Sequence, residues 1–160
     1  MNNRNVPYSL EAEQSVLGSA FLSKEALQKI CDELVTEDFY LESHQKIFDV
    51  LKDLNSEGIP VDITIMTDRL ENARELSSVG NLEYLIEIAN FVPSASNVDY
   101  YIKIVHEKSV LRKLIDAAND INNASYTSDA PVNEILDVAE KKIFDVVQKR
   151  KTSECRNIQD

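Results

Sequence analysis

The chain of 160 residues carries 28 acidic and 17 basic side chains, which give a formal net charge of −11 at pH 7. This length suits one domain, or one domain with an appendage, and a composition of 43% apolar and 28% charged residues with three glycines is typical of a helical globular protein. The acidic balance argues against tight non-specific binding to nucleic acid, and the sequence contains neither a membrane-spanning apolar run nor a secretory signal.

Short polar residues predict where the first helices begin. Ser9 is a predicted N-cap for a helix through residues 11–22, and Ser23 is the predicted N-cap of a second helix that reaches about residue 34. After a short turn, a third helix is predicted over 42–57. Gly58 can adopt the left-handed conformation that ends this helix, and Pro60 prevents its continuation.

The segment that follows could be read as a strand or as a helix. The run 61–65 is rich in β-branched residues, but the sequence offers no partner strand, so a helix capped by Asp62 is favoured. A further short helix is predicted over 82–90, and the residues VPS at 92–94 end it. Residues 1–96 are therefore expected to form a compact helical body.

The C-terminal part of the chain has the pattern of a helical hairpin. Residues 97–124 contain no glycine or proline and repeat apolar residues at helical spacing, which predicts one helix of about 40 Å. A turn rich in Asn, Ser and Asp follows, and Pro131 suits the first position of a second helix to about residue 149. Its apolar residues step by four and three, as in an antiparallel pair: Val132, Leu136, Ala139, Ile143 and Val146. The expected fold class is all-α, a compact bundle followed by a projecting antiparallel hairpin over 97–150.

The hairpin carries more apolar residues than two helices can bury against each other. Two helices need one apolar stripe each, and an exposed apolar patch marks an interface. The surplus residues are therefore candidate contacts to a partner or to a second copy of the chain, because an isologous dimer is the commonest arrangement. These candidates are Ile115, Ile121, Ile135, Val138 and Phe144.

Two residues of the body are expected to have structural roles. Gly18 destabilises a helix interior by about 1 kcal/mol relative to Ala, and it lies in a seam with Ser15 and Ser19, so it predicts close packing against another backbone. His44 lies one turn from Tyr40 and from Phe48. The favoured interpretation is a partly buried histidine that packs between aromatic rings and bonds a backbone group; a general base or pH switch is the alternative.

Motifs that would give this chain its own catalysis are missing. Its three glycines form no phosphate-binding loop, and its two histidines fit no metal motif. No serine lies in a GxSxG elbow. Cys31 and Cys155 are far apart without metal-ligand spacing, which predicts two reduced thiols in a cytoplasmic protein. No catalytic residue, cofactor or metal site is therefore assigned.

Four longer stretches are distinctive in combination: PYSLEAEQSVLGS (7–19), EDFYLESHQKIF (37–48), GIPVDITIMTDRL (58–70) and VGNLEYLIEIANFVPSASNVDYYIKIVHEKSVLRKLI (79–115). AEKKIF (139–144) and NIQD (157–160) continue them in order. Over nearly its whole length the chain resembles the N-terminal domain of the bacterial DnaB-type replicative DNA helicases. It departs from the family at Asn81, where a second glycine is usual, and at Phe91 and Ser96.

The resemblance implies a helical domain and hairpin, with hairpins that pair between subunits and three such dimers forming a collar on a hexameric ring. It implies that the collar docks the helicase-binding domain of primase, and a helicase loader is a further expected partner. Residues 151–160 would begin a linker to a RecA-like ATPase domain, where the parent protein would bind ATP and magnesium, contact DNA and unwind it. The chain alone is expected to be a non-catalytic assembly and docking module.

Two other functions remain open at this point. A nucleic-acid-binding domain would use Lys108, Arg112 and Lys113 together with the basic tail that begins at Lys141. A free-standing adaptor, such as a loader or an inhibitor, would copy the collar without an ATPase domain. The apolar surplus of the hairpin and the family motifs favour the assembly module.

Overall fold

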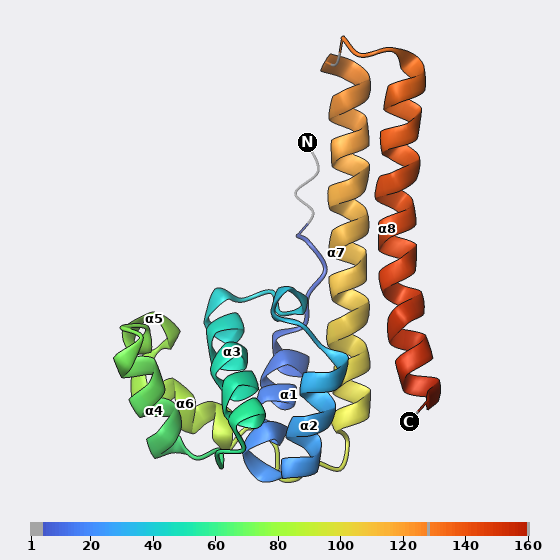
Figure 1. The fold of residues 1–160 in the computed structure, drawn as a ribbon. Coiled ribbons are helices and arrows are strands. Elements are labelled where there is room, and N and C mark those ends of the chain that lie inside the picture. Colours follow the sequence, from blue (N-terminus) through green and yellow to red (C-terminus); the bar gives the residue numbers. More distant parts are fainter. Residues whose placement is uncertain (1–4, 128, 160) are drawn as a thin grey trace. The chain divides into compact units, whose positions relative to one another are not determined.

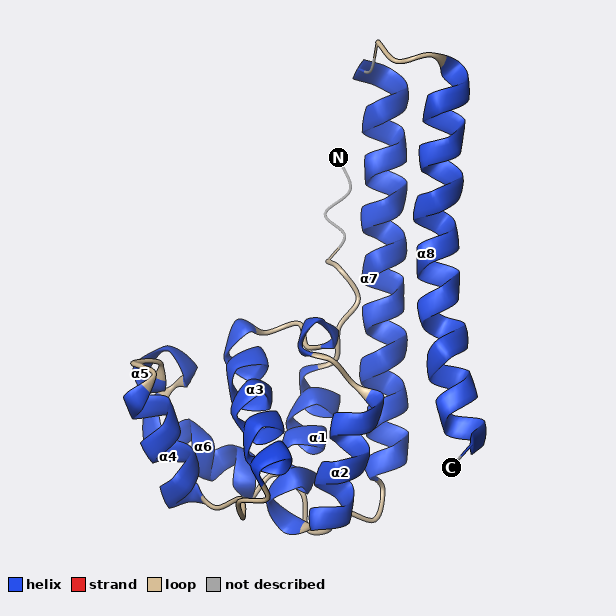
Figure 2. Ribbon diagram, in the orientation of Figure 1, coloured by secondary structure: helices blue, strands red, loops and turns tan. Residues whose placement is uncertain are grey.

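A computed structural model shows a chain of helices (Figures 1 and 2). The structure describes residues 5–127 and 129–159, with side chains as far as Gln148. These residues form two compact units: Tyr8–Glu107, which we call the body, and Lys108–Asp160 with Met1–Pro7, which we call the hairpin unit. The all-α class is confirmed, whereas the expected boundaries after residues 96 and 150 stay predictions.

The body contains seven helical elements and the first turns of an eighth. In chain order they are α1 (Leu10–Leu22), α2 (Lys24–Glu33), the short 3₁₀ helix η1 (Thr36–Asp38), α3 (Glu42–Glu57), α4 (Ile63–Asn72), α5 (Leu76–Val79), α6 (Asn81–Ala89) and α7 (Val98–Thr127). The predicted N-caps are present, because side-chain oxygens of Ser9, Ser23 and Asp62 accept hydrogen bonds from backbone N–H groups three residues later, at 3.2, 3.1 and 2.7 Å. Gly58 ends α3 with φ +72°.

The core of the body surrounds α1, which contacts α2, α3 and α6. Apolar residues at helical spacing on each of these elements supply its fully buried side chains. The apolar residues with no exposed surface, which include two from α4, are Val16, Leu17, Ile30, Ile47, Phe48, Leu51, Leu54, Met66, Leu70, Leu85 and Ile88. The first turns of α7 complete the same core with Val98, Ile102 and Val105.

Two features differ from the sequence-based expectation. α5 was not predicted, because one helical turn of four residues is too short to show a periodic pattern. It ends at Gly80, whose φ of +106° lies in the region that favours glycine. The second helix of the hairpin, α8 (Val132–Gln159), continues past the expected end near residue 149. Among the described residues, no helix is both long and apolar enough to cross a membrane.

Gly18 lies where α1 approaches the end of α6. A Cβ atom at this position would lie 2.7 Å from the backbone carbonyl oxygen of Ile88, and 3.5 and 3.6 Å from side-chain atoms of Val92 and Phe91. Real Cβ atoms essentially never come so close to a carbonyl oxygen, so either helix would have to move. The glycine therefore allows the backbones of the two helices to touch.

We predict that Gly18→Ala lowers the free energy of unfolding by about 1–2 kcal/mol. The clash is with a backbone atom, which puts the overpacking cost at about 2–3 kcal/mol, and alanine regains about 1 kcal/mol of helix propensity. Urea denaturation followed by circular dichroism measures the change. Gly58→Asn is the matched control, since nothing lies within 4 Å of a Cβ there and asparagine tolerates positive φ. A Gly18→Ala chain as stable as the parent would contradict the close approach.

Candidate protein-interaction surface

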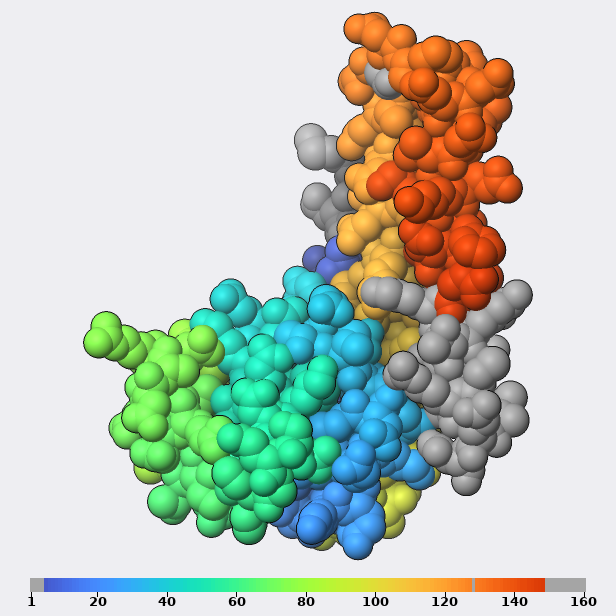
Figure 3. All heavy atoms as spheres, in the orientation of Figure 1, coloured from blue at the N-terminus to red at the C-terminus, as the bar shows by residue number. Residues whose placement is uncertain are grey.

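The hairpin unit is built from two antiparallel helices that lie side by side (Figure 2). Lys142 of α8 pairs with Asp120 of α7 at 3.1 Å, in an exposed ion pair between the two helices. The guanidinium of Arg112 donates a hydrogen bond of 2.8 Å to the carbonyl oxygen of Pro7, which ties the N-terminal segment to α7. In Figure 3 the side chains of the two helices meet along the hairpin as far as the described residues extend.

The face of α8 that packs against α7 differs from the predicted one. The partly buried residues of α8 are Ile135, Ala139, Lys142 and Val146, again at steps of four and three. Three residues of the predicted stripe do not belong to this face, because Val132, Leu136 and Ile143 are 71%, 59% and 38% exposed. The two stripes share Ala139 and Val146. They differ by a rotation of roughly half a residue step of 100° about the helix axis, so spacing alone could not choose between them.

Large apolar side chains remain on the surface of both helices. On α7 the residues facing α8 include the buried Ala117 and the partly buried Ile121, and a stripe with Leu111 and Leu114 lies beside them. On α8 the exposed apolar residues are rotated away from the residues that face α7 in the same direction as on α7. Because the two right-handed helices run antiparallel, both exposed stripes then lie on the same side of the hairpin. We call this surface the hairpin apolar face: Leu111, Leu114, Val132, Leu136, Ile143 and Val147, which are 38–71% exposed.

The five predicted contact residues are divided by the structure. Ile121 and Ile135 are partly buried on the seam side of their helices. Ile115, Val138 and Phe144 are exposed, at 37%, 49% and 56%. Their helical positions place these three outside the hairpin apolar face. Sequence reasoning missed the face itself, because it assigned most of these residues to the packing between the helices.

A buried polar network occupies the centre of the body. The Nδ1 atom of His44 lies 2.8 Å from a carboxylate oxygen of Glu13, and its Nε2 atom lies 2.6 Å from the hydroxyl of Tyr84. The other Glu13 oxygen accepts the backbone N–H of Tyr40 at 2.8 Å, and Gln14 donates to the Tyr84 hydroxyl at 3.2 Å. His44 is fully buried and its partners are side chains, not the backbone group that was expected.

The donors in this network can be assigned from its partners. A carboxylate only accepts, so the Nδ1–H of His44 donates to Glu13, and the Nε2 atom shares its hydrogen bond with the hydroxyl of Tyr84. Burial raises the pKa of Tyr84 above its ordinary value, so this phenol stays protonated and able to donate. The network joins α1, α3 and α6 and satisfies a carboxylate that is only 2% exposed. It serves as a tie between helices.

Cys31 is a free thiol on α2. Burial of its sulfur raises the pKa to about 11, which keeps it protonated at neutral pH. A protonated and half-buried thiol is a poor nucleophile, so we assign it a packing role. Cys155 lies outside the residues whose side chains are described.

We predict that His44→Leu lowers the free energy of unfolding by about 3–5 kcal/mol, because it leaves the buried carboxylate of Glu13 without its main partner. Tyr84→Phe should lower it by about 1–2 kcal/mol, since one ring nitrogen then lacks a donor. Urea denaturation at pH 7 provides both values. Tyr100→Phe, at a 65% exposed position, serves as the control. Equal midpoints for His44→Leu and the parent chain would show that the network does not stabilise the body.

Comparison with known proteins gives one family. The model of the DnaB-like helicase N terminal domain family matches residues 5–107. The chain is 45% identical over 160 residues to the replicative DNA helicase DnaC of Bacillus subtilis and 42% identical over 159 residues to the replicative DNA helicase DnaB of Geobacillus stearothermophilus. It covers 35% of each, so it spans about a third of the length of these relatives.

Two solved structures resemble the fold. The crystal structure of the N-terminal domain of DnaB helicase from Mycobacterium tuberculosis matches with a TM-score of 0.84 and 36% identity, over 88% of this chain and 99% of that one. A DnaB-like replicative helicase, whose structure was described with its interactions with primase, matches with a TM-score of 0.70 and 25% identity, over 95% of this chain and 35% of that one.

Proposed function

Because the chain belongs to the DnaB-like helicase N-terminal domain family, we propose that it is the assembly and primase-docking module of a hexameric replicative DNA helicase. In this proposal the chain contributes contacts and no catalysis. ATP, magnesium and DNA unwinding belong to a RecA-like ATPase domain of the parent protein, which acts in the cytoplasm. The chains pair as dimers, three dimers form a collar, and primase and a helicase loader are the further partners.

The hairpin apolar face is the observation that supports the assembly role. Six large apolar side chains with 38–71% of their surface exposed form a wider apolar area than scattered surface residues would. Burial of such side chains is the main driving force of association. A second hairpin laid against this face would complete a four-helix arrangement, in which each helix contacts two neighbours. A second copy of the chain fits because the same face is present on both partners.

The exposed predicted contact residues outside that face remain candidates for contacts to primase. Ile115, Val138 and Phe144 stay available when two hairpin apolar faces pair, because they lie on other sides of the helices. A related DnaB-like replicative helicase was described with its interactions with primase, which supports a primase contact for this chain by analogy. Ile121 and Ile135 stay candidates as well, although their partial burial means that a charged substitution there would also disturb the hairpin.

The basic residues of the hairpin unit give less support to the nucleic-acid-binding alternative. Arg112 is engaged with the carbonyl oxygen of Pro7, and Lys113 also has a partner within the chain. Phosphate contacts need cations that face solvent and outnumber nearby carboxylates. With a net charge of −11, the chain is better suited to a protein partner.

Leu136→Asp should weaken self-association at least tenfold, because on each of the two paired chains it removes part of the roughly 1.5–3 kcal/mol that a fully exposed leucine gains on burial and places a charge in the contact. Sedimentation equilibrium over a concentration series measures the dissociation constant, and circular dichroism checks that the helices remain. Asn123→Asp is the matched control, since it adds the same charge at an exposed position of α7 that its helical position places away from this face. If both variants associate like the parent chain, the hairpin apolar face is not the dimer contact.

Ile115→Asp should weaken binding of the primase's helicase-binding domain about tenfold, because an exposed apolar contact would then carry an unpaired charge. Isothermal titration calorimetry with the purified primase domain measures the affinity. Asn123→Asp again controls for the added charge. Unchanged affinities for Asp variants of Ile115, Val138 and Phe144 would exclude primase docking through this group.

A further inference from the structure

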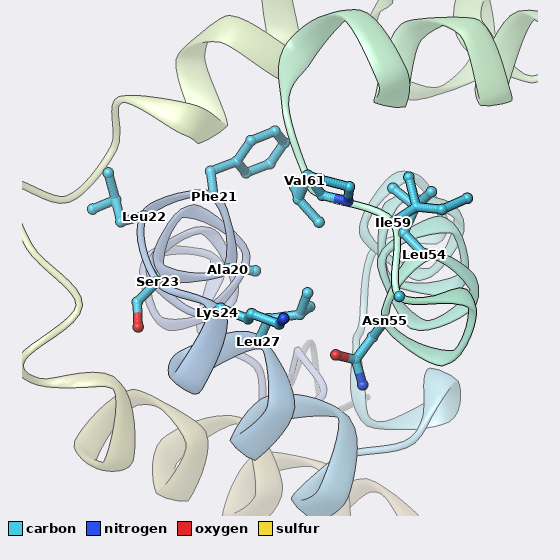
Figure 4. A pocket seen from close by; sticks show the side chains of 12 residues that line it. Ala20, Phe21, Leu22, Ser23, Lys24, Leu27, Leu54, Asn55, Ile59 and Val61 are labelled. Atoms are coloured by element: carbon cyan, nitrogen blue, oxygen red, sulfur yellow. The ribbon is translucent and has the colours of Figure 1, made fainter.

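The body contains a pocket that the proposed function leaves unused. Its volume is about 210 Å³, and it lies between the end of α1, the first turn of α2, the end of α3 and the segment that leads to α4 (Figure 4). All of its lining residues fall between Ala20 and Val61, within the body. The lining includes core side chains, so the pocket opens directly onto the hydrophobic core: Ala20, Leu27 and Leu54 are buried, and Phe21, Ile59 and Val61 pack against them.

The volume limits what the pocket can hold. Apolar cavities of about 150 Å³ accept a molecule the size of benzene, whereas pockets for drug-sized ligands and cofactors usually begin at about 300 Å³. A volume of 210 Å³ therefore fits one bulky apolar side chain, aromatic or branched, and is too small for a nucleotide. Such a pocket is suited to an anchor residue of a peptide.

The one charged residue of the lining is a cation. Figure 4 shows the ammonium group of Lys24 reaching toward the middle of the pocket, between Ala20 and Asn55. Among the described residues Lys24 forms no ion pair, while Asn55 already donates to the side chain of Gln28 at 3.2 Å. In a chain of net charge −11, a lysine at an apolar pocket whose ammonium group forms no ion pair, although its charge acts on the neighbouring Glu25, favours an anionic group beside the anchor.

The first turn of α2 does not provide that anion site by itself. Ser23 accepts the N–H of Ala26 and donates to the carboxylate of Glu25 at 3.2 Å, so the turn already holds an internal carboxylate. A backbone hydrogen bond, the Ser23 hydroxyl and the charge of Lys24 lower the pKa of Glu25, which keeps that carboxylate ionised. An incoming carboxylate would therefore pair with Lys24, with Glu25 limiting its affinity.

We propose that this pocket is a docking site for a segment of a partner protein in which a bulky apolar side chain stands next to an acidic residue. The apolar side chain enters between Phe21, Leu27 and Val61, and the carboxylate pairs with Lys24. The site involves no residue of the hairpin apolar face, so it goes beyond the proposed assembly role and can fail or succeed independently of it.

The test uses two small probes in a ¹H–¹⁵N NMR titration of the 160-residue chain. N-acetyl-leucyl-glutamyl amide carries the anchor and the carboxylate, and N-acetyl-leucyl-glutaminyl amide is its uncharged isostere. We expect saturable shifts of the backbone amides of Lys24, Gly58, Ile59 and Val61, with the acidic probe binding about two- to fivefold more tightly, as for an exposed ion pair. Shifts absent from these amides, or equal affinities of the two probes, would overturn the proposal.

Substitutions at Lys24 and Val61 test the charge contact and the apolar cavity separately. Lys24→Ala should remove the advantage of the acidic probe, Lys24→Arg should keep it, and Val61→Phe should block both probes by filling the space. Lys52→Ala is the matched control, because Lys52 is an exposed lysine of the same body that does not line the pocket. If Lys24→Ala behaves like Lys52→Ala, the charge contact is wrong even where Val61→Phe disturbs the fold.

Discussion

Two helices that pack as an antiparallel pair can bury only the stripe that each turns toward the other. In the hairpin unit this stripe contains small residues, with Ala117 of α7 buried and Ala139 of α8 partly buried. Small side chains let the two helices approach closely, and larger ones such as Leu136 and Ile143 are left outside. The contact that holds the hairpin together and the surface that can bind another molecule are therefore different faces of the same helices.

Helix α1 of the body combines buried polar groups with close packing. This helix is buried on several sides, yet it carries Glu13, Ser15, Gly18 and Ser19 among its buried residues. Both serine hydroxyls donate to carbonyl oxygens four residues earlier at 2.7 Å, so they need no partner from another helix. Glu13 is satisfied by His44 and by the backbone. The polar groups are thus paired, and the small side chains let neighbouring helices come close enough to form a rigid support.

The sequence predicted what depends on local chemistry. The N-caps bond a backbone N–H only three residues later, at Ser9, Ser23 and Asp62. The C-cap of α3 depends only on the φ angle of Gly58 itself. Each cap could therefore be predicted from the local sequence. The partners of His44 lie 31 and 40 residues away, at Glu13 and Tyr84, and no local pattern joins them. The rotation of α8 about its axis is also non-local, because it depends on which of two overlapping stripes meets α7.

The amount of apolar surface on the hairpin has a consequence for how assembly is controlled. The side chains of the hairpin apolar face are already partly covered, so each gains less than the roughly 1.5–3 kcal/mol of a fully exposed leucine on burial. Association of two free molecules opposes this gain with roughly 4–15 kcal/mol of lost freedom, so one hairpin pair alone lies close to balance. When other contacts already hold neighbouring subunits together, that opposing term is largely removed and the local concentration of the second hairpin becomes high. A face of this size is therefore expected to pair weakly between free chains and more strongly where other contacts already hold two hairpins close together.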